Sequence, residues 1–104
     1  MPDFVKVAKL SEIAPETARC VEVAGKRIGL FNLGGIVHAV DDTCPHADAS
    51  LCDGTISGTE VVCPLHFATF DLETGACTGP PADDDLATYE VRVTGDGEIE
   101  IAVG

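Results

Sequence analysis

Basic residues are scarce in this chain of 104 residues. Six Lys and Arg stand against eighteen Asp and Glu, so the formal net charge is −12. Nucleic acid is therefore not an expected partner, because binding a phosphate backbone needs a basic surface. Anionic membrane surfaces are disfavoured for the same reason. The charge instead suits a partner with a basic surface, since complementary fields speed association.

Long apolar runs are also missing, although 45% of the residues are hydrophobic. No stretch approaches the roughly 18 apolar residues that identify a membrane helix. The first residues show no basic segment followed by an apolar run, so we expect no signal peptide. These absences favour a cytoplasmic protein, in which cysteines bind metals or react more often than they form disulfides. The odd number of cysteines, five, argues against a complete disulfide framework.

Aromatic residues are few, with no Trp and one Tyr, whereas there are eleven Gly and six Pro. That glycine and proline content favours turns and short strands over helices. Apolar and polar residues alternate at 89–93 and at 99–103, on either side of a glycine-rich turn, which predicts a hairpin with one buried face. A second hairpin is expected around Gly34-Gly35. The sequence therefore predicts one all-β domain.

Two short cysteine–histidine motifs stand out in the middle of the chain. Cys44 and His46 form a C-x-H motif, and Cys63 and His66 form a C-x-x-H motif after sixteen intervening residues. Two thiolates and two imidazoles suit tetrahedral zinc, whose ligands usually come in Cys-Cys and His-His pairs. They also suit a Rieske cluster, in which two Cys hold one iron and two His hold the other. Because Cys and His alternate here, the pattern favours the Rieske cluster.

The segments Thr43–Ala47 and Cys63–His66 resemble the two cluster-binding loops of Rieske ferredoxins. The resemblance continues at Asp53-Gly54, at Thr74-Gly75 and at Gly79-Pro80-Pro81, so that it spans most of the chain. It is closest to the bacterial ferredoxins that serve ring-hydroxylating oxygenases. The Pro80-Pro81 segment matches the loop that covers the cluster in that family.

This resemblance implies an antiparallel β-sandwich or barrel as the base, with a small cluster-binding subdomain inserted in it. On that basis we expect the base to comprise residues 1–42 and 82–104. Residues 43–81 would then form the cluster-binding subdomain.

The resemblance further implies that Cys44, His46, Cys63 and His66 hold one Rieske-type [2Fe–2S] cluster. Histidine ligation lowers the negative charge of such a cluster and raises its potential above that of a four-thiolate cluster. We expect a monomeric electron carrier, not an enzyme, that passes single electrons from an NAD(P)H-dependent reductase to a terminal oxygenase. One alternative is a small Rieske subunit of a larger oxidoreductase, such as a nitrite-reductase-like system. The other is a zinc-stabilised binding module.

Four positions distinguish this chain from the Rieske proteins of respiratory chains. Those proteins carry a disulfide between the two loops, and the matching positions here are Ala49 and Leu65. They also place a Ser and a Tyr hydroxyl beside the cluster, where the matching residues are Ala68 and Phe70. Hydrogen bonds to cluster sulfurs tune the potential. We therefore expect a low-potential centre, towards the roughly −150 mV end of the Rieske range.

The remaining cysteines and the third histidine receive structural interpretations. We expect Cys20 and Cys52 to be buried small apolar residues. Cys77 lies close in sequence to the proline segment and is also interpreted as structural. His38 falls within an apolar strand, so we do not expect it to be a ligand.

Two acidic runs flank the expected cluster-binding subdomain, Asp41-Asp42 and Asp83–Asp85. Each run is interpreted either as a solvated turn or as a docking surface for a basic partner.

Overall fold

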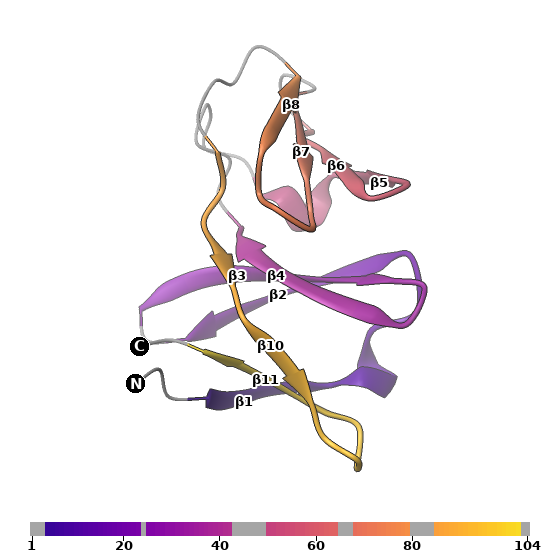
Figure 1. Ribbon diagram of the computed structural model, residues 1–104, viewed down its shortest axis with the longest axis vertical. Helices are drawn as coiled ribbons and strands as arrows, with labels where there is room; N and C mark the ends of the chain where they lie inside the picture. Colours follow the sequence, from indigo (N-terminus) through magenta and orange to yellow (C-terminus); the bar gives the residue numbers. More distant parts are fainter. Residues whose placement is uncertain (1–3, 24, 43–49, 65–67, 80–84, 103–104) are drawn as a thin grey trace.

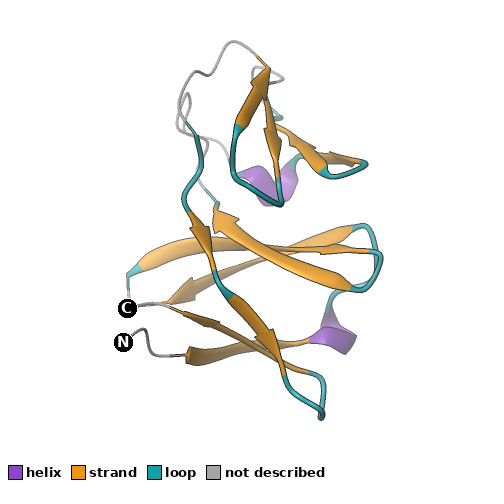
Figure 2. Ribbon diagram, in the orientation of Figure 1, coloured by secondary structure: helices purple, strands orange, loops and turns teal. Residues whose placement is uncertain are grey.

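The computed structural model describes residues 4–23, 25–42, 50–64, 68–79 and 85–102. Strands dominate these residues, and only two single turns of 3₁₀ helix accompany them there (Figure 2). None of the helices in these ranges is long and apolar enough to span a membrane. The elements are β1 (Phe4–Lys9), η1 (Leu10–Glu12), β2 (Thr17–Val23), β3 (Lys26–Leu33), β4 (Ile36–Asp41), η2 (Leu51–Asp53), β5 (Thr55–Ser57), β6 (Glu60–Val62), β7 (Thr69–Asp71), β8 (Cys77–Gly79), β9 (Thr88–Tyr89), β10 (Val91–Val93) and β11 (Glu98–Ala102).

The strands form three sheets that follow one another along the long axis of the molecule (Figure 1). The first sheet has the order β1-β11-β10, the second β2-β3-β4-β9 and the third β5-β6-β7-β8. Every strand pairing recorded for these sheets is antiparallel. The predicted all-β antiparallel fold is confirmed.

The second sheet lies between the other two and is covered on both faces (Figure 1). Successive side chains of a strand point to opposite faces. On β3, Ile28 and Leu30 accordingly enter one apolar cluster, and Phe31 enters the other. β4 divides in the same way, with Ala39 in the first cluster and Val40 in the second. This double burial explains why β3 reads as an almost continuous apolar run rather than as an alternating one.

The cluster between the first and second sheets forms the core of a β-sandwich. Its largest members from the first sheet are Ile99 and Ile101, both fully buried. They alternate along β11 with Glu98 and Glu100, as the sequence predicts for a strand with one buried face. The remaining members come from β1, β3, β4 and the turn after η1: Ala8, Ile13, Ile28, Leu30, Val37 and Ala39.

The predicted strand at 89–93 is divided between two sheets. Tyr89, in β9, pairs with Ala39 in the second sheet, whereas Val91, in β10, pairs with Ile101 in the first. The chain passes from one sheet to the other at Glu90, whose carbonyl accepts a hydrogen bond from the Ala102 N–H at 3.0 Å. An alternating pattern predicts which residues are extended, but it does not say which sheet each residue joins.

Tyr89 should ionise only at strongly alkaline pH. Its hydroxyl donates a hydrogen bond of 2.5 Å to Asp41, and burial together with this contact raises the pKa of Tyr89 to about 12 from 10.0. A raised pKa means that the neutral phenol stabilises the fold fully below pH 10 and that this contribution is lost as the pH rises to about 12.

Tyr89 is the only tyrosine, so the ultraviolet absorbance of tyrosinate reports on it alone. We expect a titration midpoint near 12 in the native protein and a lower midpoint in Asp41→Asn. A native midpoint at 10.0, the ordinary value, would contradict the contact with Asp41.

Candidate metal centre

Asp42 holds together the two ends of the segment that carries the C-x-H motif, residues 43–49. The side chain of Asp42 is only 1% exposed. The hydroxyl of Ser50 lies 2.8 Å from both oxygens of this carboxylate, and the N–H of Cys52 donates to Oδ1 at 3.1 Å. The N–H of Leu51 donates to the Asp42 carbonyl at 2.8 Å. The first motif segment therefore starts and ends at one hydrogen-bonded junction.

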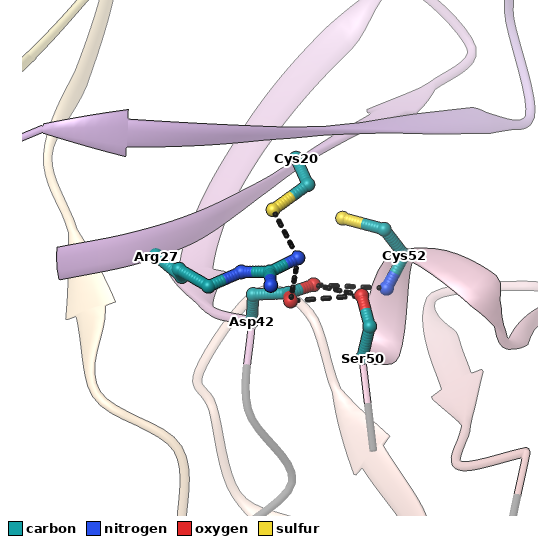
Figure 3. A network of polar contacts seen from close by, with 5 residues as sticks. All are labelled: Cys20, Arg27, Asp42, Ser50 and Cys52. Carbon is teal, nitrogen blue, oxygen red and sulfur yellow. Dashed lines mark hydrogen bonds and ion pairs between the residues drawn. The ribbon is translucent and has the colours of Figure 1, made fainter. Parts of the chain in front are cut away.

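A cation from β3 completes this junction (Figure 3). Nη2 of Arg27 lies 3.4 Å from Oδ2 of Asp42 and donates to Sγ of Cys20 at 3.2 Å. Burial by itself would raise the pKa of the Asp42 carboxyl, but hydrogen bonds from Cys52 and Ser50 and the charge of Arg27 lower it below its ordinary value. Asp42 is thus a buried, charged anchor, and neither the solvated-turn nor the docking interpretation of this residue was right.

Cys63 begins the second motif and is completely buried. It follows β6 directly, and its N–H donates to the carbonyl of Ala68 at 2.8 Å. This bond joins the two ends of the short segment that contains the rest of the C-x-x-H motif. Cys63 also belongs to the apolar cluster between the second and third sheets, together with Val61 and Phe70.

Residues 80–84, which include the predicted proline loop, are likewise closed at their described ends. The N–H of Cys77 donates to the carboxylate of Asp85 at 2.9 Å, and the N–H of Leu86 donates to the carbonyl of Gly75 at 2.7 Å. Gly75 has a φ of +79°, and a Cβ there would lie 2.4 Å from the Leu86 carbonyl oxygen. Only glycine fits this position, because it accepts positive φ and allows the close approach.

All three closed segments are anchored in one apolar cluster. Leu51, Cys63, Ala68 and Leu86 are members of this cluster, and each lies next to one of the closing hydrogen bonds. The structure thus brings Leu51, which follows the first motif segment, together with Cys63, which begins the second motif. A metal centre shared between the motifs needs this arrangement.

Of the four predicted ligands, the structure describes Cys63. Cys44, His46 and His66 lie outside the described residues. The donor set fits an iron–sulfur cluster chemically, since two thiolates and two imidazoles are the ligands of the Rieske type. The full burial of Cys63 fits as well, because a cluster thiolate must be shielded from water and oxidants.

Ala68 and Phe70 are both completely buried and belong to the same apolar cluster as Cys63. Neither side chain carries a hydrogen-bond donor. These two side chains in the surroundings of Cys63 therefore supply no hydroxyl that could donate to a cluster sulfur.

The sequence-based interpretation of Cys20 and Cys52 was wrong. Both are half-buried rather than buried, and both contact polar groups: Cys20 the guanidinium of Arg27, and Cys52 the carboxylate of Asp42. Among the described residues, Cys20, Asp42 and Cys52 form a group of possible metal ligands within 4.8 Å of one another. The sequence analysis also did not identify Ser50 as a partner of Asp42. No local sequence motif predicts the contacts around Asp42, because they depend on the packing of β2 and β3 against η2.

A family model described as the Rieske [2Fe–2S] domain matches residues 3–90. The chain belongs to this family. Its cofactor is accordingly a Rieske-type [2Fe–2S] cluster. The zinc alternative is thereby set aside.

Among characterised relatives, the Rieske domain is similar to the ferredoxin component of the naphthalene 1,2-dioxygenase/salicylate 5-hydroxylase systems of Ralstonia sp. The two are 35% identical over 91 residues, which is 88% of each chain. Among solved structures it is similar to the ferredoxin of carbazole 1,9a-dioxygenase from Nocardioides aromaticivorans IC177. That comparison gives a TM-score of 0.92 at 34% identity, over 97% of this chain and 98% of the other.

Two further solved structures bear on how such a domain is used. A ferredoxin seen in complex with the oxygenase of carbazole 1,9a-dioxygenase has a TM-score of 0.89 at 34% identity, over 95% of this chain and 92% of that one. A protein from Mycobacterium tuberculosis assigned as the small subunit of an NADH-dependent nitrite reductase has a TM-score of 0.90 at 26% identity, over 100% of this chain and 97% of the other.

Proposed function

We propose that this Rieske domain is the ferredoxin component of a ring-hydroxylating dioxygenase system. It would accept electrons from an NAD(P)H-dependent reductase and deliver them one at a time to a terminal oxygenase, as a monomeric carrier in the cytoplasm. The observation that carries the proposal is the similarity to dioxygenase ferredoxins over nearly the whole of both chains. The solved complex of such a ferredoxin with its oxygenase supports the choice of partner.

We further propose Cys44, His46, Cys63 and His66 as the ligands of the cluster. When bound, the cluster supplies the reversible one-electron chemistry. The chain would hold it at the edge of the apolar cluster that contains Cys63. Residues 43–81 would form the cluster-binding subdomain on a base of residues 1–42 and 82–104. The apolar cluster, with members from both ranges, supports the proposal that these two parts fold as one unit.

The alternative is a fixed Rieske subunit of a larger reductase, which the similarity to the assigned nitrite reductase subunit favours. The two functions differ in the lifetime of the complex. A shuttle uses a small interface and leaves its partner after each transfer, whereas a subunit stays bound.

The test is reconstitution from purified components. The holoprotein is mixed with NADH, a flavin reductase and the terminal oxygenase from the same genome, and product formation is followed against ferredoxin concentration. We expect one ferredoxin to serve many oxygenase turnovers and to elute alone in size-exclusion chromatography. Stable co-elution with a nitrite-reductase-type large subunit, without transfer to any oxygenase, would instead establish the alternative.

The cluster should have a low potential. The side chains of Ala68 and Phe70 offer no hydrogen bond that would stabilise the reduced state, and Cys63 lies in an apolar environment. We expect protein-film voltammetry near neutral pH to give a value towards the roughly −150 mV end of the Rieske range. Phe70→Tyr should shift the potential upwards if its hydroxyl reaches a cluster sulfur, and Phe70→Leu serves as the control. A clearly positive potential in the native protein would refute this expectation.

Electron transfer to the oxygenase should slow as salt is added. Asp83–Asp85 flank β8, and Asp85 is exposed while its carboxylate binds the Cys77 N–H. Replacing all three with Asn keeps an acceptor oxygen at position 85 but removes three charges. We expect the second-order rate constant at low salt to fall about tenfold, since steering contributes roughly 10–1000-fold.

Asp96→Asn is a control that removes one charge far from β8. Asp96 is exposed in the turn between β10 and β11, at the opposite end of the molecule from β8 (Figure 1). At physiological salt its replacement should leave the rate nearly unchanged, because the Debye length there is only about 8 Å. Equal effects of the two variants, or a rate insensitive to salt, would rule out docking through Asp83–Asp85.

A further inference from the structure

Two cysteines outside the predicted cluster site lie close together where β2 packs against η2. Cys20 comes from β2 and Cys52 from η2, which are separated by more than thirty residues of chain. Their sulfur atoms lie within 4.8 Å of each other. The sulfur of Cys20 is directed at Arg27, and the sulfur of Cys52 is directed toward Cys20 (Figure 3). Both side chains are half-buried, so small molecules can reach them.

The register of β2 and β3 creates the space for this pair. Cys20 pairs with Gly29, and a Cβ on Gly29 would lie 3.2 Å from Sγ of Cys52. That separation is closer than a carbon and a sulfur normally approach. The sulfur of Cys52 therefore rests over the bare backbone of β3, directly beside Cys20.

The two thiols have different electrostatic surroundings. Nη2 of Arg27 donates a hydrogen bond of 3.2 Å to Sγ of Cys20. Burial, followed by the contact with the Asp42 carboxylate, raises the pKa of Cys52 and keeps it a thiol. The contact with a cation makes Cys20 the candidate for the first oxidation, and the nearness of its sulfur makes Cys52 the candidate that resolves the product.

We propose that Cys20 and Cys52 form a peroxide-oxidisable pair that closes to a disulfide between β2 and η2. The Cys20 thiolate attacks one oxygen of hydrogen peroxide, the O–O bond breaks, and protonation of the leaving oxygen releases one water and gives a sulfenic acid. The Cys52 sulfur then attacks the Cys20 sulfur and gives up its proton, the S–O bond breaks, and the departing hydroxyl takes that proton and leaves as a second water. In total, two thiols and one peroxide give one disulfide and two waters.

A divalent metal is the competing use of this group of side chains. The guanidinium of Arg27 already lies against both Cys20 and Asp42, at 3.2 Å and 3.4 Å. A metal ion bound by both residues would have to displace this cation and remove its ion pair. The arrangement of Arg27 therefore favours oxidation over metal binding.

The disulfide would link β2 covalently to η2, which directly follows the first motif segment. η2 begins one residue after Ser50, which closes that segment against Asp42. A covalent link there restrains the unfolded chain, so the thermal midpoint of the oxidised protein should rise by about 5 °C. Oxidation would thus protect the fold around the motif rather than damage it.

Proteolysis can identify the bond, because cleavage after Asp and Glu places all five cysteines on different peptides. Cys20 falls on residues 17–22 and Cys52 on residues 49–53. The anaerobic holoprotein is treated with hydrogen peroxide at doses that leave the visible absorbance of the cluster intact. It is then alkylated, digested and analysed by mass spectrometry with and without reductant. We expect a reductant-sensitive peptide joining 17–22 to 49–53.

Four variants and one metal test complete the experiment. Cys20→Ser and Cys52→Ser should each abolish the cross-linked peptide, whereas Cys77→Ser should leave it unchanged. Arg27→Gln should slow its formation severalfold, since it removes the cation beside Cys20. Full alkylation of Cys20 and Cys52 after peroxide treatment would overturn the proposal. So would stoichiometric binding of zinc that is lost in Cys20→Ser and leaves the cluster iron in place.

Discussion

Replacing Cys63 with serine is expected to yield a protein without iron or acid-labile sulfide. Cys63 is completely buried, and its N–H is held by Ala68, so no other side chain can take its position without a rearrangement of the core. A serine hydroxyl has a far higher pKa than a thiol and is a poor ligand for iron in a cluster. Cluster binding and folding are coupled, so the variant should also lose stability.

The same loss is expected for Cys44→Ser and, to a large extent, for His46→Ala and His66→Ala. Iron and sulfide analysis measures the loss directly, and electron paramagnetic resonance of the dithionite-reduced protein identifies any cluster that remains. Cys77→Ser is the matched control, because it removes a thiol from β8 without touching either motif. If Cys63→Ser kept a full complement of iron and sulfide, the proposed ligand set would be wrong.

Replacing Asp42 with alanine should cost about 3–4 kcal/mol of unfolding free energy, a large effect for a single hydrogen-bonding residue. The carboxylate accepts hydrogen bonds from the Ser50 hydroxyl and the Cys52 N–H, and it pairs with Arg27. Hydrogen bonds to charged groups contribute about 1.5–3 kcal/mol each. Alanine removes the acceptor and leaves the buried donors without it, whereas Arg27 can turn to solvent.

Asp42→Asn separates the charge from the shape of this residue. It keeps one acceptor oxygen for the Cys52 N–H and loses the ion pair, so we expect about half the cost of the alanine variant. Asp96→Ala, on an exposed turn, should stay within about 0.5 kcal/mol of the native protein. Urea unfolding of the holoproteins, followed by far-ultraviolet circular dichroism, gives the three values. A loss below about 1 kcal/mol in Asp42→Ala would show that Asp42 does not hold the junction.

The sequence predicted well wherever a pattern is local. The alternation of Ile99 and Ile101 with glutamates gave the strand and its buried face, and Gly34-Gly35 gave the turn of a hairpin. The two cysteine–histidine motifs gave the family, because their residue types and spacing carry the chemistry of the metal centre without any knowledge of the fold.

Features that depend on contacts between distant segments were beyond the sequence. The crossing at Glu90 follows from competition between two sheets, and nothing in the alternation of Tyr89 and Val91 marks it. Asp42 looked like part of an exposed acidic run, yet it is buried because Ser50, Cys52 and Arg27 supply its hydrogen bonds and counter-charge. A local pattern does not contain partners that the chain brings together only on folding.

The sharing of β3 between two apolar clusters limits how far the iron-binding part can be transplanted. The residues of the second sheet that pack against the iron-binding part include Phe31 and Val40. The sulfur of Cys52 packs against the backbone of Gly29. A graft of residues 43–81 alone into a foreign scaffold would lack Phe31 and Val40, and it would expose the apolar side chains that pack against them. A host would need a glycine and an aromatic residue two positions apart on a central strand, with a hydrogen-bonding cation nearby, before the transplanted loops could be expected to close.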